Sequence, residues 1–247
     1  MTGTQATPPF RLVYVPGVTP GKWVRTWTER LPDVPLDLLV GSVAEAVEAL
    51  RGGGADAALV RLPIDRTGMS AIPLYTETTV VVVPKDHEVS AVDEVSVGEL
   101  ADYIVLHPLD DSLEWPTLPG LPAIDRPAST GDGIELVAAG VGLLLVPQSL
   151  ARLHHRKDLT YRPVADAPQS RVALAWLEEQ TTDLMEEFIG IVRGRTVNSS
   201  RGQAGAPSAA PAKQKQEPKQ QQKQQQRQNQ KQSPGRGAKK GQPRRRS

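Results

Sequence analysis

The chain has 247 residues, enough for one large domain or two small lobes with a buried core. Its 29 basic and 28 acidic residues leave a net charge of +1, and the absence of cysteine excludes disulfides and thiolate metal sites. Residues 1–9 are polar and lack the apolar segment of a signal peptide, so we expect them to be disordered. No apolar run approaches the roughly 20 residues that span a bilayer. We therefore expect a cytoplasmic protein without membrane contact.

The charge is divided unevenly along the chain. Residues 198–247 hold 13 Lys or Arg and one acid, a charge of +12, whereas the other 197 residues carry −11. This segment has no aromatic residue, Val, Ile, Leu or Met, so it cannot bury enough apolar surface to fold. It is predicted to be a disordered basic tail that binds nucleic acid weakly and without sequence preference, solubilises the chain, or associates with the acidic body. The candidate nucleic-acid contacts are Lys239, Lys240, Arg244, Arg245 and Arg246.

Strand and helix patterns alternate in the first part of the chain. An amphipathic helix is expected from Pro20 to just before Pro32, and a second helix begins where Ser42 can cap it and ends at Gly52–Gly54. This β-α-β-α-β order predicts a parallel sheet with right-handed crossovers. Its three strands are expected at residues 10–15, 36–40 and 57–60.

The second part of the chain repeats this alternation less regularly. A capping box at Ser96–Glu99 predicts a short helix, residues 134–139 predict another, and Ser149 is expected to cap a third. Residues 107–128 are Pro-rich and irregular, and an apolar stripe over Leu184–Val192 predicts the last helix. The expected strands are 78–83, 103–106, 143–146, 159–164 and 172–177.

Four runs in this order resemble motifs of the effector-binding domain of LysR-type transcriptional regulators. They are Gly54–Arg61 (GADAALVR), Leu74–His87 (LYTETTVVVVPKDH), Val95–Asp102 (VSVGELAD) and Leu136–Pro147 (LVAAGVGLLLVP), of which the last is the most specific. The resemblance covers residues 10–197. It implies a domain that senses a ligand, and it does not extend to DNA reading, because nothing before Phe10 resembles the family's winged helix-turn-helix.

The resemblance also implies an α/β fold with two Rossmann-like lobes joined by two crossing strands, as in type 2 periplasmic binding proteins, with the ligand between the lobes. We expect the first lobe at residues 10–80 and 178–197 and the second at 81–177. The crossings are expected near 80–84 and 172–177.

Candidate ligand contacts follow from the loops at the carboxyl ends of the strands, where open α/β sheets bind ligands. The predicted contacts are Thr19, Ser42, Arg61, Ser129 and Thr130. Backbone N–H groups at helix N-termini favour an anion, and an arginine that ends the third strand suits a carboxylate. Some family members that sense organic acids place an arginine here. Two alternatives stay open, namely that Ser42 and Ser129 only cap helices, and that Arg61 pairs with Asp65 or another acid.

Other polar residues give no sign of catalysis. No nucleophile, base and orienting group can be assembled from the sequence, and His154–His155 lack a third ligand for a metal. Trp23 and Trp27 share a helix face that suits core or dimer packing, and Trp115 can line a cleft or cover a lobe. We expect no enzyme activity, no cofactor and no metal.

The sequence therefore predicts a domain that senses a small organic acid in transcription control. Since domains of the family pair side by side, we expect a homodimer or pairing with a related regulator. Three alternatives remain: a tail-driven nucleic-acid or polyanion binder, a free-standing solute scavenger, and an enzyme such as a dehydratase on the same two-lobed scaffold.

Overall fold

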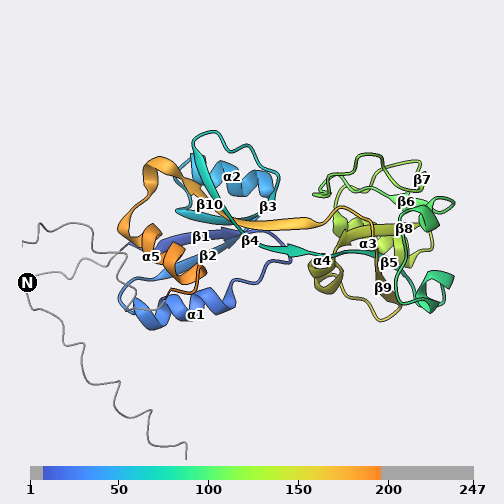
Figure 1. The fold of residues 1–247 in the computed structure, drawn as a ribbon, viewed down its shortest axis with the longest axis horizontal. Coiled ribbons are helices and arrows are strands. Elements are labelled where there is room, and N and C mark those ends of the chain that lie inside the picture. Colours follow the sequence, from blue (N-terminus) through green and yellow to red (C-terminus); the bar gives the residue numbers. More distant parts are fainter. Residues whose placement is uncertain (1–7, 196–247) are drawn as a thin grey trace, which may run out of the picture. The chain divides into compact units, whose positions relative to one another are not determined.

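The computed structural model describes residues 8–195, which fold into two α/β lobes with one five-stranded sheet each (Figure 1). Residues 198–247, with the predicted nucleic-acid contacts, lie outside the described residues, as do residues 1–7. No helix in the described part of the chain has the length and apolar character needed to cross a membrane. The two-lobed α/β fold expected from the sequence is confirmed.

The sheet of the first lobe has a parallel half and an antiparallel half. In spatial order its strands are β2 (Leu36–Val40), β1 (Phe10–Tyr14), β3 (Ala57–Leu62), β10 (Ser170–Leu177) and β4 (Met69–Glu77). β1 pairs in parallel with β2 and β3, as the β-α-β-α-β pattern predicts, whereas β10 runs antiparallel to both of its neighbours. The carboxyl ends of the three parallel strands therefore meet at one edge of the sheet.

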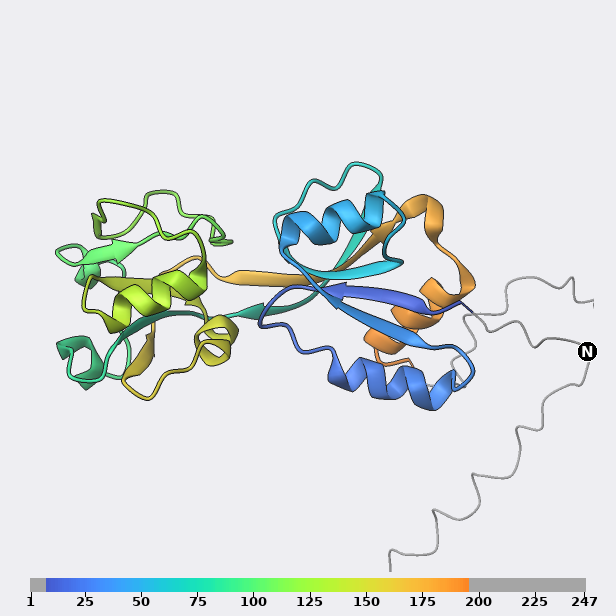
Figure 2. The same ribbon diagram turned by 180° about the vertical axis from the view of Figure 1, so that it is seen from behind.

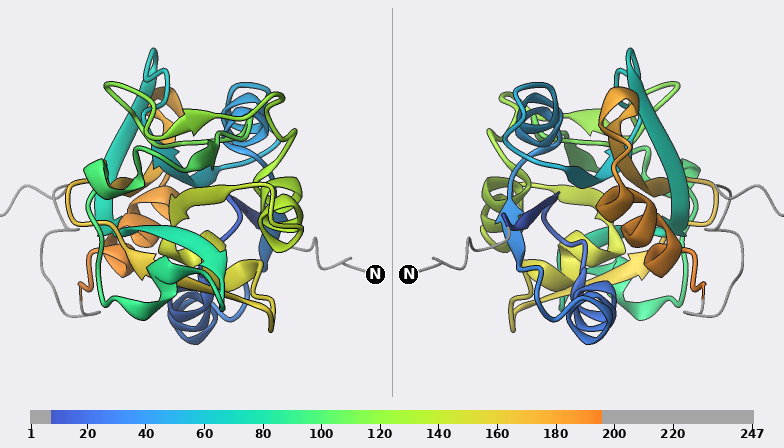
Figure 3. Two further views of the ribbon diagram at one scale, coloured as in Figure 1. Left: turned by 90° about the vertical axis from the view of Figure 1, so that its right-hand side faces the viewer. Right: turned by 90° about the vertical axis from the view of Figure 1, so that its left-hand side faces the viewer.

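Three helices cover this sheet and form the core of the first lobe. α1 (Gly21–Arg30) and α2 (Val43–Arg51) lie on opposite faces of the sheet, and α5 (Asp183–Val192) lies beside α1 (Figures 1 and 3). Phe10, Trp27 and Phe188 pack together with ring centroids 4.7 to 5.8 Å apart. Trp23 is also buried, so both tryptophans of α1 belong to the core.

The sheet of the second lobe is buried on both faces. Its strands, in spatial order, are β7 (Leu121–Pro122), β6 (Ile104–Leu106), β8 (Leu143–Pro147), β5 (Thr79–Pro84) and β9 (Leu159–Pro163). Val80 and Val82 pack in the cluster under α3 (Thr130–Ala138) and α4 (Gln148–Leu153), whereas Val81 and Val83 pack in the opposite cluster. The 3₁₀ turns Glu88–Ala91 and Gly98–Leu100 supply residues to that opposite cluster. Successive strand residues point to opposite faces, which explains why the valine run is continuous.

Two chain crossings connect the lobes (Figures 1 and 2). The first leads from β4 through Thr78 into β5, and the second leads from β9 through residues 164–169 into β10. Because all of β10 lies in the first lobe's sheet, residues 170–177 belong to the first lobe and not, as expected from the sequence, to the second. Val80 and the rest of β5 belong to the second lobe.

Strand β4 has no counterpart among the predicted strands. It contains Pro73, which removes a backbone donor, and its residues after the buried Met69 are half-buried or exposed without a regular alternation. A proline is tolerated here because β4 is an edge strand, paired only with β10, and the register shifts between Val172 and Ala173 opposite it.

Two predicted helix starts also differ from the structure. α3 begins at Thr130, four residues earlier than expected, because Ser129 caps it. α4 has Pro147 at its N-cap position and no side-chain cap, so the prediction that Ser149 caps a helix is wrong. The Ser149 hydroxyl instead accepts a hydrogen bond from Arg61. The capping box predicted at Ser96–Glu99 is incomplete: the Ser96 N–H and hydroxyl donate to Glu99 Oε2, but the Glu99 N–H donates to the Ser96 carbonyl and not to its hydroxyl, and only a 3₁₀ turn follows.

The aromatic core of the first lobe makes a stability prediction. Phe188→Ala removes a fully buried ring and leaves a cavity, so we expect the free energy of unfolding to fall by about 3–5 kcal/mol. Urea denaturation followed by circular dichroism measures the loss. Ile124→Ala is the control, because Ile124 is fully exposed and should change stability little. Equal effects of the two substitutions would contradict this account of the core.

Candidate functional site

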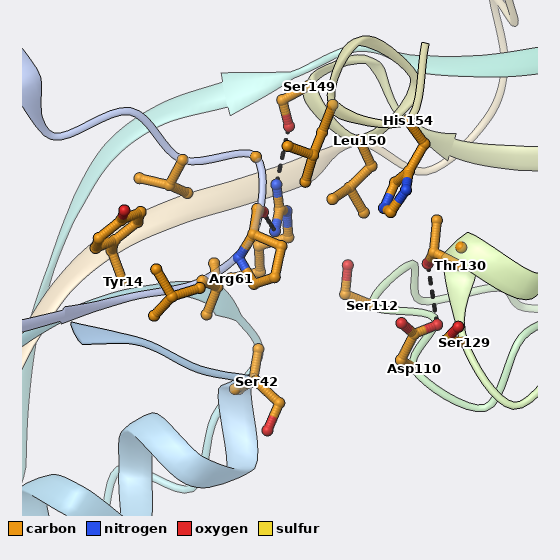
Figure 4. Close-up of a pocket in the computed structure, with 18 of the residues that line it drawn as sticks. Tyr14, Ser42, Arg61, Asp110, Ser112, Ser129, Thr130, Ser149, Leu150 and His154 are labelled. Atoms are coloured by element: carbon orange, nitrogen blue, oxygen red, sulfur yellow. Dashed lines mark hydrogen bonds between the residues drawn. The ribbon is translucent and has the colours of Figure 1, made fainter. Parts of the chain in front are cut away.

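A cleft of about 810 Å³ lies between the two lobes (Figure 4). The first lobe contributes the loop after β1, the start of α2 and the end of β3, and the second lobe contributes the start of α3, one side of α4 and part of the segment 107–128. The structure brings all five predicted site residues to the lining of this cleft: Thr19, Ser42, Arg61, Ser129 and Thr130.

Ser42 caps α2 at the first lobe's side of the cleft. Its hydroxyl accepts a hydrogen bond from the Glu45 backbone N–H at 3.2 Å, and its own N–H donates to Glu45 Oε2 at 2.7 Å. This bond from the Ser42 N–H lowers the pKa of the Glu45 carboxyl. The N–H group of Val43, which lines the cleft, has no acceptor within the helix, because it belongs to the first turn. The cleft is thus bordered by a backbone donor at this point.

Ser129 caps α3 on the second lobe's side of the cleft, and Thr130 is the first residue of that helix. The Ser129 hydroxyl caps the helix by accepting from the Asp132 N–H at 3.1 Å, and it also lies 2.8 Å from Asp132 Oδ2. Thr130 is buried, and its hydroxyl donates to Asp110 Oδ1 at 2.9 Å (Figure 4). The capping interpretation of both serines is confirmed by these contacts.

Arg61 lies in the cleft wall with its charge already paired. Its Nε and Nη2 donate to Glu77 Oε2 at 3.2 and 3.1 Å, and the two side chains are 4% and 9% exposed. Nη1 donates to the Pro16 carbonyl at 2.7 Å, and Nη2 also donates to Ser149 Oγ at 2.9 Å. Asp65, the acid suggested by the sequence, pairs instead with Arg51. The guanidinium thus has few donors left for a ligand.

The second lobe adds residues that sequence reasoning missed. Asp110, Ser112, Arg152 and His154 line the cleft, although adjacent acids such as Asp110–Asp111 usually indicate a solvated surface. The irregular segment 107–128 brings Asp110 back to the start of α3, which no local pattern indicates.

The neighbouring Asp111 has a different environment from that of Asp110. It accepts hydrogen bonds from the Leu113 N–H and Trp115 Nε1, and burial raises the pKa of its carboxyl. Trp115 packs against the second lobe's core, which favours the covering role that the sequence left open.

The cleft offers hydrogen-bonding groups and apolar walls more than a strong net charge. Glu77 offsets the charge of Arg61, and Asp110 adds a carboxylate. Arg152 has no acidic partner within residues 8–195, and its Nε lies 3.3 Å from the Tyr161 hydroxyl. Such a cleft is suited to holding a small molecule by helix N-terminal donors and apolar contact.

Gly17 controls how closely the first lobe's loop approaches α4. Its φ of +83° favours glycine, and an added Cβ would lie 2.7 Å from Ser149 Oγ and 2.9 Å from Arg61 Nη2. Gly68 also has a positive φ, +69°, but no atom lies within 4 Å of the position of its Cβ.

We therefore expect Gly17→Ala to destabilise the protein more than Gly68→Ala, because only the first adds a steric clash to the shared backbone strain. The free energy of unfolding should fall by about 1–3 kcal/mol more in Gly17→Ala than in Gly68→Ala, in the range of overpacking in a well-packed site. Parallel urea titrations of the two variants measure it. Equal losses would show that the loop moves away freely.

Comparisons with known proteins agree with this geometry. Residues 10–196 match the family model described as the LysR substrate binding domain. A probable hydrogen peroxide-inducible genes activator of Mycobacterium leprae is 31% identical over 181 residues, which are 68% of this chain and 58% of that protein. The regulator AlsR of Bacillus subtilis is 24% identical over 74% of this chain and 64% of its own length. The chain thus spans about three fifths of the length of these relatives.

Solved structures share the fold. The BenM effector-binding domain with benzoate superposes with a TM-score of 0.62 at 21% identity, covering 76% of this chain and 91% of that one. The oxidised form of OxyR has a TM-score of 0.63 at 19% identity, covering 76% and 93%. Because residues 10–196, most of the chain, match the family model, this chain belongs to the family of LysR substrate-binding domains.

Proposed function

We propose that this protein senses a small organic anion in the interlobe cleft as part of transcription control. The observation that carries the proposal is that the N-termini of α2 and α3, from different lobes, border one cleft. Free N–H groups and the helix dipole favour an anion at each of these ends. A ligand that contacts both ends binds one arrangement of the lobes best, which is the basis of a sensing response.

The walls of the cleft favour an anion with an apolar body. The side chains that contribute this surface are Val15, Val18, Val40, Val43, Leu150 and Leu153. Together with the hydroxyls of Thr19, Ser42, Ser129 and Thr130, they suit an aromatic or branched carboxylate. Benzoate is a suitable probe of this class, and a benzoate complex is known for the BenM domain with the same fold.

Sensing by thiol oxidation is the competing function. Relatives are named as probable hydrogen peroxide-inducible genes activators, and OxyR structures exist in oxidised and reduced forms. A thiol switch requires cysteine, and none occurs in this sequence. The chemistry of this domain therefore favours effector binding over thiol oxidation.

A thermal shift assay of the full chain with benzoate tests the proposal. A ligand at a hundred times its Kd stabilises the folded state by about 2.7 kcal/mol. We expect benzoate to raise Tm and benzylamine, a cation of similar size, to leave Tm unchanged. Ser42→Ala should reduce the shift caused by benzoate, because it disturbs the helix N-terminus at the cleft.

Thr182→Ala is the matched control for that experiment. Thr182 caps α5 by accepting from the Met185 N–H, and it does not line the cleft. Its loss should lower Tm by itself, through about 1 kcal/mol of lost capping, but leave the benzoate shift intact. Stabilisation by benzylamine, or no stabilisation by benzoate and related carboxylates up to millimolar concentration, would contradict the proposal.

We further propose that the domain forms a homodimer or pairs with a related regulator. Exposed apolar residues outside the cleft support this, since Leu38 and Leu39 lie on the edge strand β2 and Leu118, Leu121 and Ile124 lie on the second lobe. Nucleic-acid binding by residues 198–247 stays a prediction from composition.

Sedimentation velocity at tens of micromolar protein tests the homodimer. Leu39→Glu should shift the population to monomer, because it places a charge on the β2 edge. Val92→Glu, at another exposed apolar position in the second lobe, is the control and should leave the dimer intact. A monomeric parent protein would exclude the homodimer, and pairing with a related regulator would then need to be tested by co-purification.

A further inference from the structure

We infer that the buried Arg61–Glu77 pair is a positioning device that sets the spacing of the two lobes through the bond from Arg61 to Ser149. The inference deepens the proposed function, because the width of the ligand cleft depends on this spacing. Arg61 then acts on the ligand through the lobes that it holds, in contrast to the direct carboxylate contact expected from the sequence.

Burial fixes the position of the guanidinium. The side chains of Arg61 and Glu77 are 4% and 9% exposed, so neither charge can be left without its partner. Glu77 is the last residue of β4, directly before the crossing at Thr78, and Arg61 lies near the end of β3, which is separated from β4 by β10. The ion pair therefore lies at the start of the first chain crossing.

The remaining donors of Arg61 extend this site to both lobes. Nη1 donates to the Pro16 carbonyl in the loop after β1, at 2.7 Å, and Nη2 donates to Ser149 Oγ in α4, at 2.9 Å (Figure 4). One guanidinium thus connects a strand end, a cleft loop and the second lobe. Gly17 allows this approach, since any side chain there would collide with both Ser149 and Arg61.

Other interlobe contacts are less able to define the spacing. The ion pair of Arg171 with Glu114 is 3.9 Å long, and its side chains are 58% and 63% exposed, so solvent screens it. The backbone bond from the Gln148 N–H to the Thr78 carbonyl lies at the crossing itself and can persist while the lobes rotate about it.

The contacts of Arg61 differ in how readily they break. The Glu77 bond joins two buried charges, whereas the Ser149 bond joins the guanidinium to a neutral hydroxyl that is half-buried at the cleft. Movement of the second lobe can release Ser149 while Glu77 still neutralises Arg61. The ion pair is the fixed part of the device and the hydroxyl bond is the releasable part.

Ser170 places an additional hydroxyl group beside the Arg61–Glu77 pair. It pairs with Glu77 in the β10–β4 register, so the two side chains share one face of the sheet. Its hydroxyl is buried and has no hydrogen-bond partner among the described residues. A buried donor without a partner in the described part of the chain therefore lies beside the ion pair, on the face of the sheet that Glu77 occupies.

Pulsed EPR on the full chain tests the inference without a ligand. The sequence has no cysteine, so Glu29→Cys in α1 and Ala139→Cys at the end of α3 provide one nitroxide in each lobe. We expect one narrow distance distribution for the labelled parent. Ser149→Ala should shift or broaden it, and Ser149→Thr, which keeps a hydroxyl, should restore it. Glu77→Gln should have the larger effect if it folds.

Arg171→Ala is the matched control, because it removes the exposed interlobe ion pair and should leave the distribution unchanged. An unchanged distribution in Ser149→Ala would overturn the inference, as would a broad distribution in the labelled parent or an equal shift in Arg171→Ala. These outcomes do not depend on benzoate. Failure of the positioning device is therefore distinguishable from failure of the proposed anion sensing.

Discussion

The buried charge of Arg61 constrains the region where the two lobes meet. A guanidinium that is almost removed from water must be neutralised and hydrogen-bonded where it stands. Glu77, the Pro16 carbonyl and Ser149 meet this requirement from three separate segments. The loop after β1 has to bend close to the guanidinium, and Gly17 permits that bend. The geometry of this part of the cleft wall therefore follows from the need to supply hydrogen-bond partners to one buried charged side chain.

Much of the fold is readable from the sequence because its cause is local. The periodicity of apolar residues predicts the strands and amphipathic helices of the first lobe. The capping box of Ser42 with Glu45 indicates where α2 begins. The valine run of β5 indicates burial on both faces. β4 escaped prediction because Pro73 and half-exposed positions hide an edge strand, which only its partner β10 defines. The lobe assignment of β10 likewise depends on pairing between segments far apart in the sequence.

The candidate site likewise has features that local sequence predicts and features that depend on long-range contacts. All five residues predicted from strand ends and helix starts line the cleft, because parallel strands bring their carboxyl ends to one edge of each sheet. The partners of those residues were not predictable. Glu77 reaches Arg61 across 16 residues, Ser149 reaches it across 88, and Asp110 reaches Thr130 across 20. Sequence patterns place a residue at the cleft. Which acid pairs with it, and how many of its donors stay available, depend on contacts between segments far apart in the sequence.

The helix N-termini of the cleft are themselves partly occupied by carboxylates of the chain. Glu45 and Asp132 bond to the caps Ser42 and Ser129, and Asp110 accepts from Thr130. These acids reduce the positive potential that an isolated helix end would present. An anion that enters the cleft therefore gains less from charge alone and relies more on apolar contact and on spanning both lobes. The affinity of such a site depends on the lobe spacing, so a residue that fixes this spacing controls recognition without touching the ligand.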